Sequence, residues 1–373
     1  MRRWIVAVAI VLGLVACSGD PADQPPGSRE HGEGLSLSQP RAVHRATRLD
    51  DGRVLITGGC TEPGCGGFDA GRTSDLFDPA AGVSAGPSMG TARASGTATL
   101  LTDGRVLLTG GYPGEGAPPT SSAEIFDPVS GSFASTGDLA VARADHSASL
   151  LEDGKVLLAG GFDASGRALA STEVFDPVSG EFTDGPALAA PRAAHVATRV
   201  GALVVVVGGT EDSAALATSE VLEAGRWHAG PTLLTPRVKL GVAPIGGGRV
   251  WVVGGATETE GHEKLASTEL LDLRRQSSTP GPSLPQGEYK LDGAVSILDD
   301  GRVVVPSGDA LAVFDPGRGV LSELAVTTYQ AGSFRTVTPL AGSRVLVAGG
   351  YDDDITPTAE AVVVRIPKRT PSA

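Results

Sequence analysis

Several things are scarce in this sequence, and each absence excludes a class of protein. Basic residues are outnumbered, 30 against 43 acidic ones for a formal net charge of -13, which argues against a nucleic-acid partner. No nucleophile elbow, phosphate loop or spaced metal-ligand motif is present. The apolar run at residues 4–15 is too short to span a bilayer as a mature helix. Motifs alone therefore assign no catalytic residue, no cofactor and no metal.

The first residues have the pattern of an export signal. Arg2 and Arg3 precede the apolar run, and a basic start before a short apolar segment fits a secretory signal. Residues 14–17 (Leu-Val-Ala-Cys) resemble a bacterial lipobox, which implies cleavage before Cys17 and attachment of lipid to its thiol. The alternative is an ordinary signal cut elsewhere, with Cys17 incidental. We expect a lipid-anchored protein of the bacterial cell envelope, periplasmic or surface-facing.

The predicted domain boundaries follow from this start. Residues 1–16 are the signal peptide, and residues 17–33, rich in Pro, Gly, Asp and Ser, form a flexible tether. The outer membrane is the preferred address, because Ser18 and Gly19 carry no strong inner-membrane retention signal.

The rest of the chain is built on a repeat of about 50 residues, a period typical of propellers and solenoids. Its most regular sign is a diglycine, found at Gly58-Gly59, Gly110-Gly111, Gly160-Gly161, Gly208-Gly209, Gly254-Gly255 and Gly349-Gly350, with Ser307-Gly308 as a degenerate copy. These copies indicate about seven units.

Each unit contains four short strand candidates. In the unit from Arg143 to Leu188, Asp153-Gly154 supplies the tight turn of a hairpin, because Gly and Asp tolerate positive φ. The strand after that turn, residues 156–158, is an apolar run that we expect to be buried between neighbouring blades. Four antiparallel strands per unit are the pattern of a propeller blade. We therefore predict an all-β propeller of about seven four-stranded blades.

The repeats run without a break from about Arg41 to Pro367, which predicts one propeller domain at residues 34–367 followed by a tail at residues 368–373. The last unit ends after its third strand. Residues 34–37 precede Arg41 much as residues 185–188 precede Arg192. We expect this N-terminal segment to pair with the last blade and close the ring.

The unit resembles a Kelch repeat, with its diglycine after the second strand and a Ser-x-Glu-x-Phe pattern on the third. The motif Leu-Leu-x-Asp-Gly-Arg-Val-Leu-Leu-x-Gly-Gly is similar to the repeats of the Kelch propellers in bacterial secreted proteins and in the galactose-oxidase central domain. The resemblance covers nearly the whole chain after residue 33. The sixth unit departs from it, since Ser307-Gly308 replaces the diglycine there.

A basic residue near the entry to each innermost strand is the first candidate site. The candidates are Arg41, Arg93, Arg143, Arg192, Arg237, Lys290 and Arg335. In the Kelch family that the unit resembles, arginines at such positions can line a pocket for acidic ligands. Guanidinium groups suit carboxylates or phosphates. The alternative is structural: each pairs inside its blade with a recurring third-strand acid, namely Asp75, Glu124, Glu173, Glu220, Glu269 or Glu360.

Other polar features are weaker candidates. Three histidines lie three residues after the arginine, at His44, His146 and His195; they could bind zinc in principle, but hydrogen-bonding fillers are expected. Asp352-Asp353-Asp354 lacks the spacing of a calcium site and is expected to be a solvated loop. Cys60 and Cys65 share one loop and are expected to form a disulfide in an exported protein, with metal binding as the alternative.

Two classes of function remain. The first is a monomeric, non-enzymatic binding or scaffold propeller for a protein, peptide or glycan, which could be anionic. The second is a sugar-processing envelope enzyme of the mutarotase type. Galactose-oxidase chemistry is disfavoured, because the resemblance implies a copper site with two Tyr, two His and a Cys crosslinked to one Tyr. The residues Tyr112, Tyr289, Tyr329 and Tyr351 show no matching motif. We favour binding, because fold alone implies no reaction.

Overall fold

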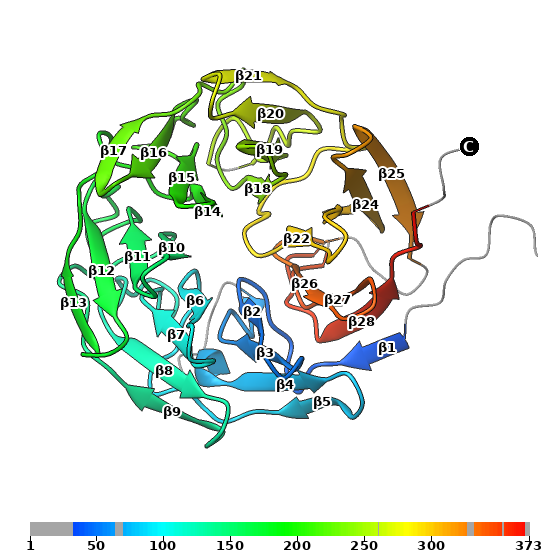
Figure 1. The fold of residues 1–373 in the computed structure, drawn as a ribbon. Coiled ribbons are helices and arrows are strands. Elements are labelled where there is room, and N and C mark those ends of the chain that lie inside the picture. Colours follow the sequence, from blue (N-terminus) through cyan, green and yellow to red (C-terminus); the bar gives the residue numbers. More distant parts are fainter. Residues whose placement is uncertain (1–32, 64–69, 260, 327–331, 353, 370–373) are drawn as a thin grey trace, which may run out of the picture.

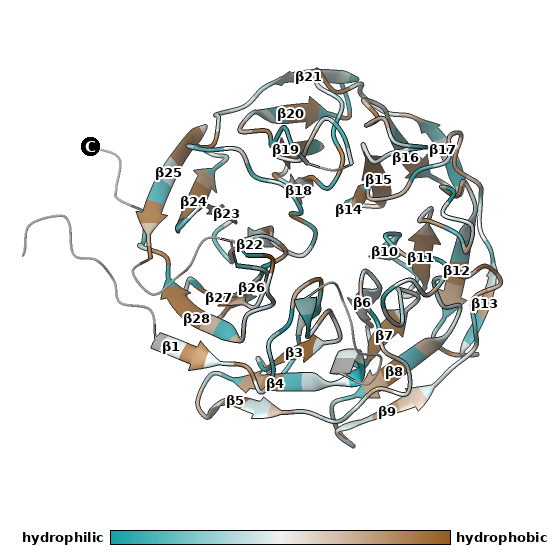
Figure 2. Ribbon diagram, turned by 180° about the vertical axis from the view of Figure 1, so that it is seen from behind, coloured by the Kyte–Doolittle hydropathy of each residue, from teal (hydrophilic) through white to brown (hydrophobic). Residues whose placement is uncertain are grey.

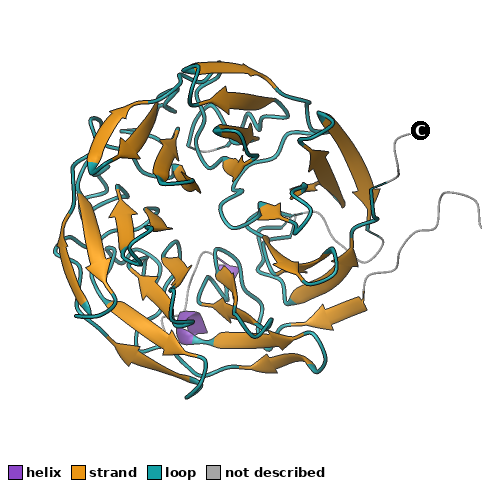
Figure 3. Cartoon of the chain, viewed as in Figure 1, coloured by secondary structure: helices purple, strands orange, loops and turns teal. Residues whose placement is uncertain are grey.

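The computed structural model describes residues 33–63, 70–259, 261–326, 332–352 and 354–369. Within them the chain forms seven four-stranded antiparallel sheets set radially around one axis (Figure 1). Figure 3 shows strands and loops with only short helical turns such as η2 (Ala70–Arg72). The predicted seven-bladed propeller is confirmed.

The blades are numbered along the chain, with strands given from the axis outward. Blade 1 contains β2 (Arg45–Arg48), β3 (Val54–Thr57), β4 (Ser74–Asp78) and β5 (Gly82–Ala85). Blade 2 contains β6 (Thr97–Leu100), β7 (Val106–Thr109), β8 (Ala123–Asp127) and β9 (Ser132–Ser135). Blade 3 contains β10 (Ser147–Leu150), β11 (Val156–Ala159), β12 (Thr172–Asp176) and β13 (Glu181–Asp184). Blade 4 contains β14 (Val196–Val200), β15 (Leu203–Val207), β16 (Ser219–Glu223) and β17 (Arg226–Ala229). Blade 5 contains β18 (Gly241–Pro244), β19 (Arg249–Val253), β20 (Thr268–Asp272) and β21 (Ser277–Pro280). Blade 6 contains β22 (Ser296–Ile297), β23 (Val303–Ser307), β24 (Ala310–Asp315) and β25 (Val320–Ala325). Blade 7 contains β26 (Thr336–Leu340), β27 (Arg344–Ala348), β28 (Glu360–Arg365) and β1 (Glu33–Ser36).

The inner hairpin of each blade follows from its sequence. In blade 3, Gly154 has φ 84° and the Asp153 carboxylate accepts the backbone N–H of Lys155 at 3.1 Å, so the two residues fix the turn. The second strand that follows is apolar on both faces; Val156, Leu157 and Leu158 are at most 2% exposed. Figure 2 shows second strands such as β3, β11 and β15 in brown. The second strand of each blade has the least polar sequence, and its burial between neighbouring blades stabilises the fold.

Aromatic side chains pack both within and between blades. Phe126 contacts Phe133 of the same blade with ring centroids 5.0 Å apart, and Trp251 of blade 5 stacks on Phe314 of blade 6 at 4.7 Å. The largest apolar cluster among the described residues joins blades 5, 6 and 7. Blades 6 and 7 of this group are also the ones in which the polar repeat is most degenerate, so apolar packing replaces polar pairing there.

The ring closes as predicted. Strand β1 pairs antiparallel with β28, with Leu35 opposite Ala361. Leu37 is 4% exposed and its N–H donates to the carbonyl of Ala359 at 2.8 Å, as the N–H of Leu188 donates to the carbonyl of Ala170 at 2.9 Å in blade 3. The first and last described strands therefore build one blade, in which β1 covers the edge that β28 would otherwise expose.

Antiparallel order gives the propeller two unlike faces. The Asp-Gly turns and the turns between third and fourth strands lie on one face, which we call the turn face. The loops after the diglycines lie on the other, together with the segments that enter each innermost strand; we call this the loop face. The neighbouring innermost strands also touch, β2 with both β6 and β26. The entry segments therefore meet around the axis on the loop face.

Candidate ligand-binding site

Five of the seven predicted basic site residues lie inside their blades. Arg41, Arg93, Arg143, Arg192 and Arg237 are at most 5% exposed. Each makes an ion pair of 2.7–3.0 Å with a third-strand carboxylate: Asp75, Glu124, Glu173, Glu220 and Glu269, in that order. The structural interpretation of these arginines is therefore the one that matches the observed contacts.

Blade 3 shows how the pair ties its blade together. Arg143 donates from Nη1 to the carbonyls of Gly160 at 2.8 Å and Ser171 at 3.1 Å, and from Nη2 to Glu173 at 2.7 Å. The Glu173 carboxylate also accepts the backbone N–H groups of Ala140 and Val141 at 2.8 and 3.2 Å. These contacts satisfy a buried charge pair with further hydrogen bonds. They also turn the Nη groups away from solvent, so this arginine does not face an external ligand.

Blade 6 lacks both partners, and its predicted alignment was wrong by two residues. In the regular blades the second N–H of the diglycine donates to the carbonyl of the next arginine, as Gly209 does to Arg237 at 2.8 Å. The corresponding bond runs from Gly255 to Glu288 at 2.8 Å, so Glu288, not Lys290, takes the arginine position. Ala312 takes the carboxylate position, because it stands opposite Val305 as Glu173 stands opposite Leu158.

Blade 7 also lacks both partners. The bridge between Ser333 and Tyr351 matches that between Ala144 and Phe162, which puts Gly332 in the arginine position. Val362, opposite Val347, takes the carboxylate position in place of the expected Glu360. Arg335, 3% exposed, stands in the histidine position. A two-residue shift keeps the alternation of a strand, which is why the sequence pattern did not reveal it.

Seven half-buried residues around the axis, two after each arginine position, form what we call the axial ring. Its members are Val43, Ser95, Asp145, Ala194, Lys239, Lys290 and Phe334. All seven have φ between 51 and 59°, a left-handed conformation that side-chain-bearing residues adopt at a cost. The blades thus share one backbone geometry here and differ only in the side chain presented.

Backbone hydrogen bonds link the ring from blade to blade. The N–H of Asp145 donates to the carbonyl of Ser95 at 2.9 Å, that of Ala194 to Asp145 at 3.0 Å, and that of Lys239 to Ala194 at 2.9 Å. Such bonds hold the strained conformation in place.

The sequence did contain a signal for the ring. In Arg-Ala-x-His the third position varies from unit to unit while its neighbours recur.

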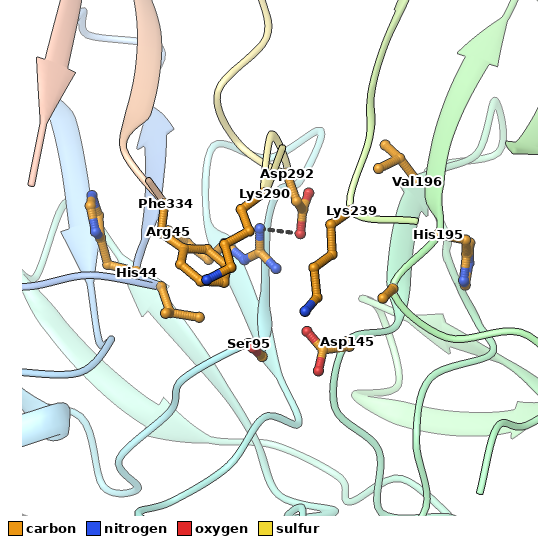
Figure 4. A pocket seen from close by; sticks show the side chains of 12 residues that line it. His44, Arg45, Ser95, Asp145, His195, Val196, Lys239, Lys290, Asp292 and Phe334 are labelled. Atoms are coloured by element: carbon orange, nitrogen blue, oxygen red, sulfur yellow. Dashed lines mark ion pairs between the residues drawn. The ribbon is translucent and has the colours of Figure 1, made fainter. Parts of the chain in front are cut away.

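The ring side chains line a pocket on the axis, the axial pocket (Figure 4). An ion pair crosses it, because Arg45 of blade 1 lies 2.5 Å from Asp292 in the segment that enters blade 6. That segment also reaches blade 7, where the carbonyl of Gly293 accepts the N–H of Val337 at 3.0 Å. The irregular entry to blade 6 therefore fixes one side of the pocket.

Charged side chains face one another inside the axial pocket. Asp145 and Lys239 point toward the same space in Figure 4. Burial raises the pKa of Asp145; the charge of Asp292 adds to this, and Ser95, Lys239 and Arg45 oppose it. Burial also lowers the pKa of Lys239, as does the charge of Lys290. The pocket thus holds an acid and an amine that are less easily ionised than in water.

A larger cavity of about 820 Å³ adjoins the axial pocket on the loop face. Val43, Ser95, Lys290 and Phe334 line both spaces. Further walls come from loops after the diglycines of blades 1, 2, 3 and 7, including Tyr112, the segment at 113–119 and Tyr351. Burial raises the pKa of Tyr112 to about 12, so its hydroxyl stays protonated. A space of this size, with apolar walls and few polar groups, suits a small ligand.

The three predicted histidines serve the contacts between blades. Nε2 of His44 lies 2.9 Å from the Thr336 hydroxyl of blade 7, and Nε2 of His195 lies 2.9 Å from Ser147 of blade 3. Burial lowers the pKa of both to about 3 and puts that of His146 well below its usual value. In Figure 4 His44 and His195 lie on opposite sides of the pocket. Within the described part of the chain, no three His, Cys, Asp or Glu side chains are grouped to hold a metal.

The remaining predicted features are only partly described. Cys60 is disulfide-bonded; Cys65, its expected partner, and Cys17, the expected lipid site, lie outside the described residues. Asp352 accepts the backbone N–H groups of Asp354 and Thr356 at 3.0 and 2.8 Å, so it shapes its own loop. Asp353 is not described.

These contacts also test the copper site that the oxidase resemblance implies. Its crosslink needs a free thiol, and Cys60 is already in a disulfide. Its two imidazole ligands would have to face one point, whereas His44 and His195 are buried and bonded to hydroxyls of different blades. The described residues do not fit this copper site.

Comparison with known proteins supports the fold. A model of the Kelch motif matches residues 152–189, which lie in blade 3. A fungal alcohol oxidase of the AA5 family, determined in complex with copper, is similar in structure with a TM-score of 0.71 at 14% identity, over 91% of this chain and 77% of the oxidase. The structure of YjhT is similar with a TM-score of 0.60 at 12% identity, over 89% of this chain and 96% of YjhT.

At such low identities these structures show a shared fold alone. No curated protein matches the chain in sequence. None of the helical segments within the described ranges is long and apolar enough to cross a membrane.

Proposed function

We propose that this Kelch-motif propeller is a non-enzymatic binding module whose ligand enters through the loop face and contacts the axial ring. The observation that carries the proposal is the ring itself: seven equivalent backbone positions present two aliphatic side chains, one hydroxyl, one carboxylic acid, two amines and one aromatic ring. A position that served only the fold would repeat its residue, as the buried arginines do. Variation at one face of a fixed frame is typical of a recognition site.

The shape of the site favours a small ligand or the end of a larger one. The cavity of about 820 Å³ is concave and is lined by tyrosine, proline and glycine near the charged ring residues. Aromatic walls with a few polar groups bind the flat faces of ring compounds and orient their polar substituents. A glycan or peptide end that lies in this cavity and contacts the ring residues Ser95, Lys290 and Phe334 fits this arrangement.

The site can be tested by filling it. Ala194→Trp would place a large side chain in the axial pocket and should abolish binding of any hit from a glycan and peptide array. Ala224→Trp is the matched control, because Ala224 also has a left-handed backbone, φ 47° against 51°, but lies in an exposed turn. Equal binding by wild type and Ala194→Trp would place the ligand elsewhere and overturn the proposal.

The proposed address is the cell envelope, through lipid on Cys17. It rests on the lipobox resemblance of residues 14–17. A Cys17→Ala variant should lose the lipid and leave the membrane fraction. Wild-type processing and fractionation of that variant would contradict the anchor.

A second candidate is a sugar-processing enzyme of the mutarotase type, and Asp145 is the observation that favours it. Opening a sugar hemiacetal needs a group that gives a proton to one oxygen and takes one from another. A carboxyl group whose pKa is raised by burial, beside an amine whose pKa is lowered, is suited to that exchange. Accelerated anomer exchange by wild type in NMR, lost in Asp145→Asn, would support the enzyme. Binding without acceleration supports the module.

A further inference from the structure

Lysine is rare in this chain, and its distribution is uneven. The sequence contains five lysines, Lys155, Lys239, Lys264, Lys290 and Lys368, against a formal net charge of -13. Three of them, Lys239, Lys264 and Lys290, converge where the entry segments of blades 5 and 6 and the β19–β20 loop meet. The ammonium groups of Lys264 and Lys290 lie over the ring of Tyr289, 5.2 and 4.8 Å from its centroid. We call these three the lysine cluster.

The members of the lysine cluster repel one another. After burial, the largest cause of the lowered pKa of Lys290 is the charge of Lys264, and for Lys239 it is the charge of Lys290. The positive charge of Lys239 is partly compensated. Its ammonium group donates to the carbonyl of Thr259 at 2.7 Å, and the negative charges of Asp145 and Glu258 attract it. Gathering like charges in a half-buried site costs stability unless a counter-charge is supplied.

Lys290 is the member without such compensation. Its ammonium lies 4.5 Å from the ring centroid of Phe334 and 4.8 Å from that of Tyr289. No carboxylate makes an ion pair with it, and no acid is among the causes that shift its pKa, within the described ranges of the chain. It lines both the axial pocket and the larger cavity. The unmatched charge therefore faces the space that a ligand would occupy.

We infer that the lysine cluster is an anion subsite that receives a carboxylate of the ligand, centred on Lys290. This inference rests on the proposed function and names the chemistry of its ligand. Phe334 and Tyr351 contact each other with centroids 6.0 Å apart and line the cavity beside Lys290. The ligand is then a carboxylic acid whose carboxylate adjoins a ring or apolar body. A uronic-acid residue of a glycan and an aromatic residue at a peptide carboxyl terminus are two sources of that chemistry.

Matched probes test the charge separately from the rest of the ligand. Calorimetry would compare galacturonic acid with galactose, and N-acetylphenylalanine with its amide, against the purified protein. We expect at least one acid to bind about 10-fold more tightly than its neutral partner, since a charge-assisted hydrogen bond is lost with the charge. The pair that shows the difference identifies the source.

Variants then assign the charge to the cluster. Lys290→Met should lower the affinity for that acid about 10-fold or more, and Lys290→Arg should keep most of it. The exposed Lys264→Met, expected to lose less, serves if Lys290→Met does not fold. Lys155→Met is the control, because Lys155 pairs with Asp176 on the turn face and should bind as wild type does.

The failures of the two proposals are distinguishable. Equal affinity for acid and neutral probe, no binding of either acid, or acid binding that survives both Lys290→Met and Lys264→Met overturns the anion subsite. Array hits that Ala194→Trp abolishes would keep the binding module standing in each of those cases.

Discussion

Arg143 and Asp145 stand two residues apart in the same entry segment, yet they belong to two different kinds of position. The Arg143 side chain is 0% exposed and its partners are repeated in five blades. Asp145 is half-buried, and none of the other six ring positions carries the same residue. In a repeat protein, a recurring polar residue solves a problem of the fold that each unit has. A residue that changes while its backbone stays fixed is free to serve the one ligand that all blades share.

Blades 6 and 7 strengthen this contrast, because each has lost both members of the ion pair. Glu288 and Ala312 replace it in blade 6, and Gly332 and Val362 replace it in blade 7. Removing one member of a buried pair leaves an uncompensated charge, whereas replacing both with packed groups can be neutral. The joint loss is what a structural pair predicts. A ligand-binding arginine would have no reason to depend on a carboxylate inside its own blade.

The largest expected effect comes from breaking one such pair. Arg143→Ala leaves the buried Glu173 carboxylate without its cation, at a cost of about 3–5 kcal/mol in the free energy of unfolding. Urea unfolding followed by circular dichroism measures it. Glu173→Ala should lose a similar amount. A loss below about 1 kcal/mol would show that the pair does not hold the blade, and the contrast with the ring would fail.

The double variant Arg143→Met with Glu173→Leu copies what blades 6 and 7 do. It should be more stable than either single alanine variant, because no buried charge remains unpaired. Additive losses would contradict this.

An intermediate effect is expected at the histidine positions, and it depends on pH. Burial, then the charge of Arg192, lowers the pKa of His195 to about 3 in the folded protein, while the unfolded chain keeps a value near 6.5. The unfolded state therefore binds the proton first, and stability falls as the pH drops from about 6.5 toward 3. The slope is about 1.4 kcal/mol per pH unit for one histidine, or about 2 kcal/mol at pH 5.

His195→Leu removes that term, and leucine already occupies the same position as Leu240 in blade 5. The difference in unfolding free energy between pH 7 and pH 5 should be smaller in the variant by about that amount. Parallel pH profiles of the two proteins would mean that His195 is not buried neutral.

The sequence predicted the frame of this molecule much better than its site. Diglycines, Asp-Gly turns and apolar second strands fix the blade and its copy number, because hairpin turns and burial are local requirements that residue type satisfies directly. The closing strand was predictable because Leu37 repeats the place of Leu188. The axial ring was not recognised, because its function depends on seven segments meeting at the axis. Lys290 stands out in the sequence only if blade 6 is aligned two residues out of register, and the hydrogen bond from Gly255 to Glu288 corrects that alignment.

The smallest effect, of opposite sign, is expected in the axial ring itself. Burial raises the pKa of Asp145 above its unfolded value, so this group contributes stability only at low pH and loses it as the pH rises through the folded pKa. At pH 7 the ionised carboxylate is therefore a net cost, partly offset by Ser95 and Lys239. Asp145→Asn keeps the shape and removes the charge, and it should raise the unfolding free energy at pH 7 by up to about 1 kcal/mol. The gain should vanish near pH 3, where the wild-type group is protonated. Thermal unfolding of the two proteins at both pH values measures this. A loss of several kcal/mol at pH 7 would place Asp145 with the buried arginines as part of the frame, whereas a small gain would show a residue retained for the ligand.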